Sequence, residues 1–90
     1  MKTDFKLLSF LLRGKRRQAV LQALDKPKTP KDIAKDCKIS ISNVSNALAE
    51  LVQKKLVKCN NPEDHLYKFY ELTETGKKAV KAVLEYESKK

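Results

Sequence analysis

The feature that most constrains the fold is a pair of helix-start signals placed close together in the middle of the chain. Thr29, Pro30 and Asp32 supply a threonine N-cap, a proline at the first helical position and a carboxylate at the third. A second start follows at Ser40 or Ser42, which leaves the first helix about two turns. Two helices that are joined by a turn of three or four residues form a helix-turn-helix.

The segment after the second start has a helical period and two unlike faces. One face is apolar and is formed by Val44, Ala47, Leu48, Leu51 and Val52. The opposite face carries short uncharged side chains: Ser42, Asn43, Ser45, Asn46 and Ala49. An ordinary solvated face usually carries Glu and Lys, whereas Asn can pair with adenine and Ser with several base edges. We therefore favour a base-reading role for this face over a merely solvated one.

The flanking segments indicate helices at both termini and a hairpin. Residues 3–12 are apolar over more than one helix face, Gly14 is expected to break the helix in a left-handed conformation, and residues 15–24 have helical spacing. After Lys55 the apolar period changes from 3.6 to 2, which predicts two strands with a tip of five or six residues. Thr73 then caps a last helix that ends near Glu87.

These elements predict a mainly α fold with a small β-hairpin (α+β), in the winged helix-turn-helix arrangement. We expect one domain over residues 1–90, with an N-terminal dimerisation helix at 1–13, the helix-turn-helix at 29–54, the wing hairpin at 56–72 and a C-terminal helix at 73–88.

The net charge of +9 is concentrated in the first two thirds of the chain. Residues 1–60 hold 14 lysines and arginines against 5 aspartates and glutamates, whereas residues 61–90 hold 6 of each. Such a basic surface is typical of proteins that bind nucleic acid or another anionic surface. Because 90 residues provide little scaffold for an elaborate active site, we do not expect an enzyme.

The sequence also resembles a known group of proteins. The stretch TPKDIAKDCKISISNVSNALAELVQKKLVKCNNPED, followed by LYKFYELTETGKKAV, is similar to archaeal winged helix-turn-helix transcriptional regulators of the ArsR/MarR-like superfamily. The resemblance covers about residues 15–80. It implies a homodimer that places the second helix of the motif in the DNA major groove, with the hairpin wing beside it.

Several positions depart from that pattern. Glycine is common where Lys38 and Lys55 stand, so each lysine is expected to adopt an unusual backbone or a slightly different turn. The wing tip carries Glu63 and Asp64, which repel phosphates. We therefore do not expect this wing to insert deeply into the minor groove.

A dense basic cluster, Arg13, Lys15, Arg16 and Arg17, opens the second helical segment. Cations at a helix N-terminus are unfavourable, which favours phosphate contact over a merely solvated helix start. The caps Thr29 and Ser40 could add backbone N–H groups for phosphate oxygens. The complete set of expected DNA-backbone contacts is Arg13, Lys15, Arg16, Arg17, Thr29, Lys31, Lys38, Ser40, Lys54, Lys58 and Lys68.

Two cysteines and one histidine do not form a catalytic or metal-binding pattern. Cys37 and Cys59 lack the paired spacing of a zinc site, and both fall on inward phases. We expect them to be small buried hydrophobic residues rather than redox sensors, and His65 to be a solvated loop residue. No metal or cofactor is expected.

The two terminal helices each contain more apolar residues than a single buried face needs. They either complete the core of the subunit or form a two-fold interface, and we favour the interface. The expected interface residues are Phe5, Leu8, Leu12, Val80, Val83, Leu84 and Tyr86. A dimer of this kind sets two recognition helices roughly 34 Å apart, which predicts a palindromic site.

The sequence as a whole therefore predicts a cytoplasmic, homodimeric regulator of transcription that binds double-stranded DNA sequence-specifically and represses by occluding a promoter. No membrane partner and no small-molecule ligand is indicated. Two alternatives remain open: a winged-helix module for protein–protein interaction, and an architectural DNA binder of low specificity.

Overall fold

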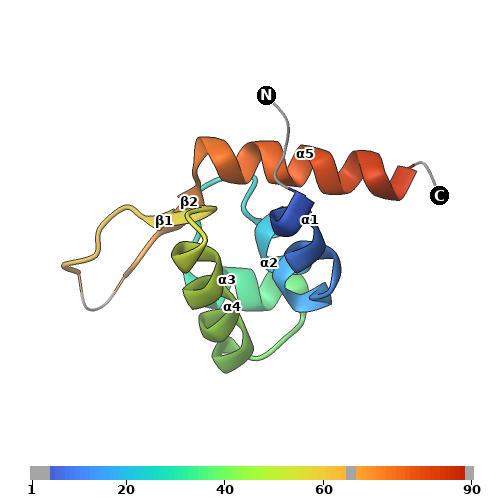
Figure 1. The fold of residues 1–90 in the computed structure, drawn as a ribbon. Coiled ribbons are helices and arrows are strands. Elements are labelled where there is room, and N and C mark those ends of the chain that lie inside the picture. The colour runs from blue at the N-terminus through green and yellow to red at the C-terminus, as the bar shows by residue number, and fades with distance from the viewer. Residues whose placement is uncertain (1–4, 65–66, 89–90) are drawn as a thin grey trace.

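The computed structural model describes residues 5–64 and 67–88, and it contains five helices and one two-stranded sheet in that range. The order along the chain is α1 (Phe5–Leu12), α2 (Lys15–Ala23), α3 (Pro30–Cys37), α4 (Ile41–Gln53), β1 (Val57–Cys59), β2 (Tyr70–Leu72) and α5 (Glu74–Ser88). Figure 1 shows α5 across the top of the molecule, α1 and α4 below it on opposite sides, and the hairpin projecting laterally on the side of α4. The predicted fold class is confirmed.

Both helices of the helix-turn-helix begin where their capping residues predict. The Thr29 hydroxyl accepts a hydrogen bond from the Asp32 N–H at 3.2 Å, and the Ser40 hydroxyl accepts one from the Asn43 N–H at 3.1 Å. Each bond satisfies an N–H that would otherwise lack a partner in the first helical turn. Ser40, rather than Ser42, is therefore the cap of α4.

Both lysines at the positions where glycine is common have a left-handed backbone. Lys38 ends α3 with φ 59° and ψ 42°, and Lys55 follows α4 with φ 62°. Gly14 behaves differently from the prediction, because its φ of −120° is extended rather than left-handed. A Cβ at Gly14 would lie 2.8 Å from Cδ of Arg17, so this glycine is explained by a close approach instead.

The hairpin is shorter in its strands and longer in its tip than predicted. Val57 pairs with Leu72 and Cys59 with Tyr70, and residues 60–69 connect the strands. Asn61 organises part of this connection, since its Oδ1 accepts a hydrogen bond from the Phe69 N–H at 2.8 Å and its amide donates to the Tyr67 carbonyl. His65 and Leu66 lie outside the described residues.

A further pairing joins the hairpin to the loop before α3. The Lys28 N–H donates to the Tyr70 carbonyl at 3.0 Å, and the Tyr70 N–H donates to the Lys28 carbonyl at 2.8 Å. The sequence did not predict this bridge. It fixes the base of the wing against the start of the helix-turn-helix.

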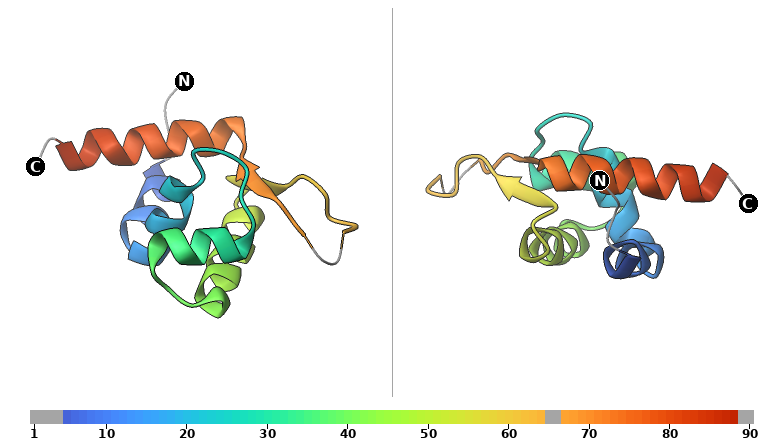
Figure 2. Two further views of the ribbon diagram at one scale, coloured as in Figure 1. Left: turned by 180° about the vertical axis from the view of Figure 1, so that it is seen from behind. Right: turned by 45° about the horizontal axis from the view of Figure 1, so that its top comes forward.

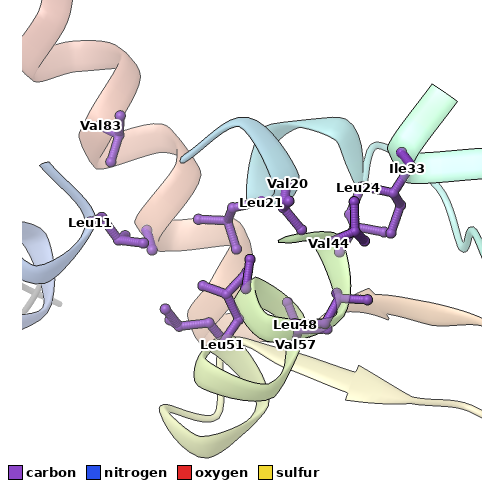
Figure 3. Packing of buried hydrophobic residues seen from close by; sticks show 14 residues of the cluster. Leu11, Val20, Leu21, Leu24, Ile33, Val44, Leu48, Leu51, Val57 and Val83 are labelled. Carbon is purple, nitrogen blue, oxygen red and sulfur yellow. The ribbon is translucent and has the colours of Figure 1, made fainter. Parts of the chain in front are cut away.

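One apolar core joins all five helices and β1. Leu11, Val20, Ile33, Val44 and Leu51 are fully buried at its centre, and Figure 3 shows their side chains converging.

Two predicted positions are corrected by this core. Val83, an expected interface residue, is 1% exposed and belongs to the core of the subunit. Val52, expected on the buried face of α4, is 40% exposed. Val52 follows Val44 by eight residues, which rotates it about 80° around the helix and away from the core.

Helix α5 crosses the molecule above α1, and its C-terminal end projects beyond the other helices in both views of Figure 2. Its start is fixed to the link between α4 and β1: the Thr73 hydroxyl donates to the Lys55 carbonyl at 2.7 Å and accepts from the Gly76 N–H at 3.0 Å. A Cβ at Gly76 would lie 2.0 Å from the Leu56 carbonyl oxygen. Only glycine therefore allows α5 to lie this close to the residue before β1.

Candidate nucleic-acid interface

The uncharged face of α4 is largely open to solvent. Ser42, Ser45, Asn46 and Ala49 are exposed, and Asn43 is half-buried. This placement follows from the helical period, because Val44, Ala47, Leu48 and Leu51 on the other side of α4 are all buried. The five residues that were predicted to read bases are thus on one accessible face, with hydrogen-bonding side chains at four of the five positions.

The basic start of α2 lies beside this face. Arg13, Lys15, Arg16, Asn43 and Asn46 line a common hollow of about 330 Å³. Arg13, Lys15 and Arg16 are exposed. The structure therefore combines, in one concave surface, residues that are about 30 positions apart in the sequence and that were predicted separately for phosphate and base contact.

A second groove lies between α4 and the wing. It has a volume of about 420 Å³, and its lining includes Ser45 and Ala49 from α4 together with Cys59 and Lys68 from the hairpin. Val52 also lines this groove, which explains its exposure. The polar face of α4 is therefore flanked by a basic hollow on one side and by the wing on the other.

The remaining predicted backbone contacts are in several environments. Thr29 and Ser40 are helix caps, and Lys31 and Lys38 are exposed. The Lys58 ammonium pairs with Glu71 across the hairpin at 3.4 Å.

Arg17 differs from the rest of its cluster, because its guanidinium already has partners within the protein. Its Nε and Nη2 donate to the two carboxylate oxygens of Glu50 at 3.2 and 2.8 Å, and Nη1 donates to the Phe10 carbonyl at 3.1 Å. The guanidinium also lies over the Phe10 ring, 4.0 Å from its centroid. The hydrogen bond from Arg17 lowers the pKa of Glu50, and the same bond raises the pKa of Arg17.

Sequence analysis did not predict Glu50 or Phe10 as site residues. The available signal was weak: Glu50 is the only acidic residue between Lys38 and Pro62. Lys54, a predicted phosphate contact, is exposed and places its ammonium 5.3 Å from the centroid of the same Phe10 ring.

Both cysteines are half-buried. The Cys37 thiol donates to the Ala19 carbonyl at 3.4 Å, and burial raises its pKa, which disfavours the reactive thiolate. Within residues 5–64 and 67–88, no group of three or more histidine, cysteine or acidic side chains is placed to hold a metal ion.

The terminal helices carry several apolar side chains that the core does not fully bury. Leu84 and Tyr86 are 51% and 43% exposed, and Leu8, Leu12 and Val80 are half-buried. Leu12 and Tyr86 line a further hollow of about 560 Å³ with Gln18 and Gln22 of α2. The Phe5 side chain lies outside what the structure describes. In the described part of the chain, no helix is both long enough and apolar enough to cross a membrane.

Comparison with known proteins gives a consistent result for the fold. No protein-family model and no curated protein matches the sequence. Solved structures do match it, and they include MepR of S. aureus in complex with DNA, at 27% identity and a TM-score of 0.75, over 93% of this chain and 72% of that one.

Two other matches are of the same kind. ZitR of Lactococcus lactis, solved in complex with DNA, is 26% identical with a TM-score of 0.70, over 82% of this chain and 52% of that one. A MarR-family transcription regulator is 21% identical with a TM-score of 0.76, over 92% of this chain and 59% of that one. The chain thus has the winged-helix fold of MarR-family transcription regulators, and it spans between about half and three quarters of their length.

Proposed function

We propose that this protein binds double-stranded DNA sequence-specifically and regulates transcription as a homodimer, and that it is not an enzyme. The observation that carries the proposal is the single concave surface where Arg13, Lys15 and Arg16 meet Asn43 and Asn46. Positive charge beside an uncharged hydrogen-bonding helix face combines phosphate attraction with base recognition. Structural neighbours that were solved with DNA support the same conclusion.

In this proposal α4 enters the major groove, and its polar face reads base edges. Asn46, which is exposed on that face, can pair bidentately with adenine N6 and N7. Because the face holds no arginine for guanine, discrimination depends on a few pairs that each contribute about 1–3 kcal/mol. The exposed basic side chains of the hollow contact phosphates, as does Lys68 from the wing side.

Homodimerisation through α1 and α5 would supply the second half-site contact. Two recognition helices roughly 34 Å apart fit a palindromic operator. A protein that occupies such an operator within a promoter excludes the transcription machinery, so repression is the proposed mode of action, in the cytoplasm.

Fluorescence anisotropy with labelled duplexes at two salt concentrations tests the proposal. The duplexes are a random-sequence pool and a sequence selected from that pool by binding. We expect the selected duplex to bind more tightly and both affinities to fall steeply with salt, with log K changing by about −0.9 per phosphate neutralised.

Three outcomes would contradict parts of this account. Absence of binding would indicate a protein-interaction module, equal affinity for both duplexes would indicate an architectural binder, and a salt-independent affinity would contradict the phosphate contacts. A matched control is Lys81→Gln, which removes an exposed positive charge from α5 and is expected to change affinity little.

A further inference from the structure

Arg17 joins three helices at one point. It lies in the first turn of α2, bonds both carboxylate oxygens of Glu50 on α4, and donates to the carbonyl of Phe10 near the end of α1. Bidentate pairing of arginine with a carboxylate is among the strongest hydrogen-bonded arrangements in proteins. The Arg17 side chain is only 26% exposed, which agrees with a guanidinium committed to internal partners.

Gly14 lies against the same side chain. A Cβ at this position would lie 2.8 Å from Cδ, 3.1 Å from Cγ and 3.1 Å from Nη1 of Arg17. The backbone of Gly14 is extended, so the absence of a side chain is not required by its φ. Glycine here keeps open the space through which Arg17 reaches Glu50.

Glu50 lies where a free carboxylate would oppose DNA binding. Among the residues that the structure describes, it is the only acidic one that lines the hollow with Arg13, Lys15 and Arg16. Its side chain is 45% exposed, so it faces whatever occupies that surface. A phosphate within about 10 Å, the screening length at 0.1 M salt, would be repelled by an unpaired carboxylate.

We infer that Arg17 is a positioning residue that acts through Glu50: it masks the one carboxylate of the DNA-binding hollow instead of contacting phosphate itself. The inference rests on the proposed function and corrects the sequence-based expectation for Arg17. Three of the five guanidinium N–H groups of Arg17 already donate to Glu50 and Phe10. A bidentate phosphate contact through Nε and Nη2 would therefore replace Glu50, and the freed carboxylate would then repel the same phosphate.

The test compares wild type with Arg17→Gln, Glu50→Gln and the double variant, each titrated with the selected duplex at several salt concentrations. Masking predicts that Arg17→Gln weakens binding about tenfold or more, because like charges placed together at an interface are costly. It predicts that the double variant recovers to within about threefold of wild type and keeps the wild-type salt slope, since no phosphate contact is lost.

A phosphate-contacting Arg17 predicts a different pattern. The double variant would then stay as weak as Arg17→Gln, and both salt slopes would decrease by about 0.9. If Arg17 and Glu50 only stabilise the fold, the double variant would also bind DNA weakly, because it lacks the ion pair just as Arg17→Gln does. Thermal unfolding of the same proteins measures the stability that both variants lose. Failure of the double variant to recover overturns the inference alone, whereas failure of wild type to bind DNA overturns the proposed function as well.

Discussion

Lys55 has a backbone conformation that residues other than glycine rarely adopt. Its φ of 62° lies in the left-handed region, which costs a non-glycine residue about 1–2 kcal/mol. Lys55→Gly should therefore raise the free energy of unfolding by about 1 kcal/mol, measured by urea denaturation. The neighbouring Lys54 has φ −85° and ψ 2°, so Lys54→Gly should lower stability or leave it unchanged. Equal effects at both positions would contradict a conformational cause.

Glu50 should make stability depend on pH on the acid side. Its pKa is lowered in the folded protein by the hydrogen bond from Arg17, so its contribution is present above the ordinary carboxyl pKa and is lost as pH falls through the folded value. The difference in unfolding free energy between wild type and Glu50→Gln should be constant from pH 5 to 7 and shrink below about pH 4.

Asp25 also has a lowered pKa, because of the hydrogen bond from Lys28. It remains in both proteins, so subtracting one stability curve from the other isolates Glu50. A difference that does not vary with pH would contradict the ion pair.

For single residues, the sequence predicted those features that depend on near neighbours along the chain. The caps Thr29 and Ser40 and the solvent-facing side of α4 follow from neighbours within a few residues. The partner of Arg17 could not be predicted in this way, since Glu50 is 33 residues away and meets it only through the packing of α2 against α4.

Helix α5 closely approaches the backbone of Leu56, the residue before β1. A Cβ at Gly76 would meet the Leu56 carbonyl oxygen at 2.0 Å, and a backbone atom cannot move aside as a flexible side chain can. Gly76→Ala should therefore lower the free energy of unfolding by about 3 kcal/mol, despite the higher helix propensity of alanine. The exposed neighbour Thr75 gives a control, because Thr75→Ala should change stability by no more than about 0.5 kcal/mol. Similar effects for both variants would contradict the close approach.

The wing shows what sequence patterns cannot determine at the scale of elements. Alternation of apolar residues predicted strands on both sides of the turn, but it does not distinguish paired strand from extended loop. Two hydrogen bonds between the Asn61 side chain and the backbone across the loop, one accepted from the Phe69 N–H and one donated to the Tyr67 carbonyl, replace part of the expected ladder. The bridge between Lys28 and Tyr70 depends on tertiary structure and has no local signal.

At the scale of the whole molecule, the terminal helices leave apolar side chains exposed outside the α4 surface. Leu84 is half-exposed on α5, in a region that we propose as the dimer interface. Sedimentation of wild type at micromolar concentration should give a dimer, and Leu84→Glu should shift it toward a monomer near 10.3 kDa. Tyr67→Glu, at an apolar position on the wing that is 66% exposed, should leave the dimer intact. A wild-type protein that sediments only as a monomer would contradict the interface.

The distribution of charge now has a structural explanation. Part of the excess positive charge in the first two thirds of the sequence lines the hollow beside α4. One of the arginines that line this hollow, Arg17, is paired with Glu50 inside the protein. The central claim is a separation of roles, in which Arg13, Lys15 and Arg16 attract the DNA backbone while Asn46 and its neighbours on α4 read the bases.

The most direct test of that claim is the ratio of dissociation constants for random and selected DNA. Asn46→Ala should lower this ratio about tenfold by weakening binding to the selected sequence, in keeping with about 1–3 kcal/mol per bidentate pair. Arg16→Gln should instead weaken binding to both duplexes equally and reduce the salt slope by about 0.9. If Asn46→Ala weakens both duplexes equally and leaves the ratio unchanged, α4 does not read bases through this face.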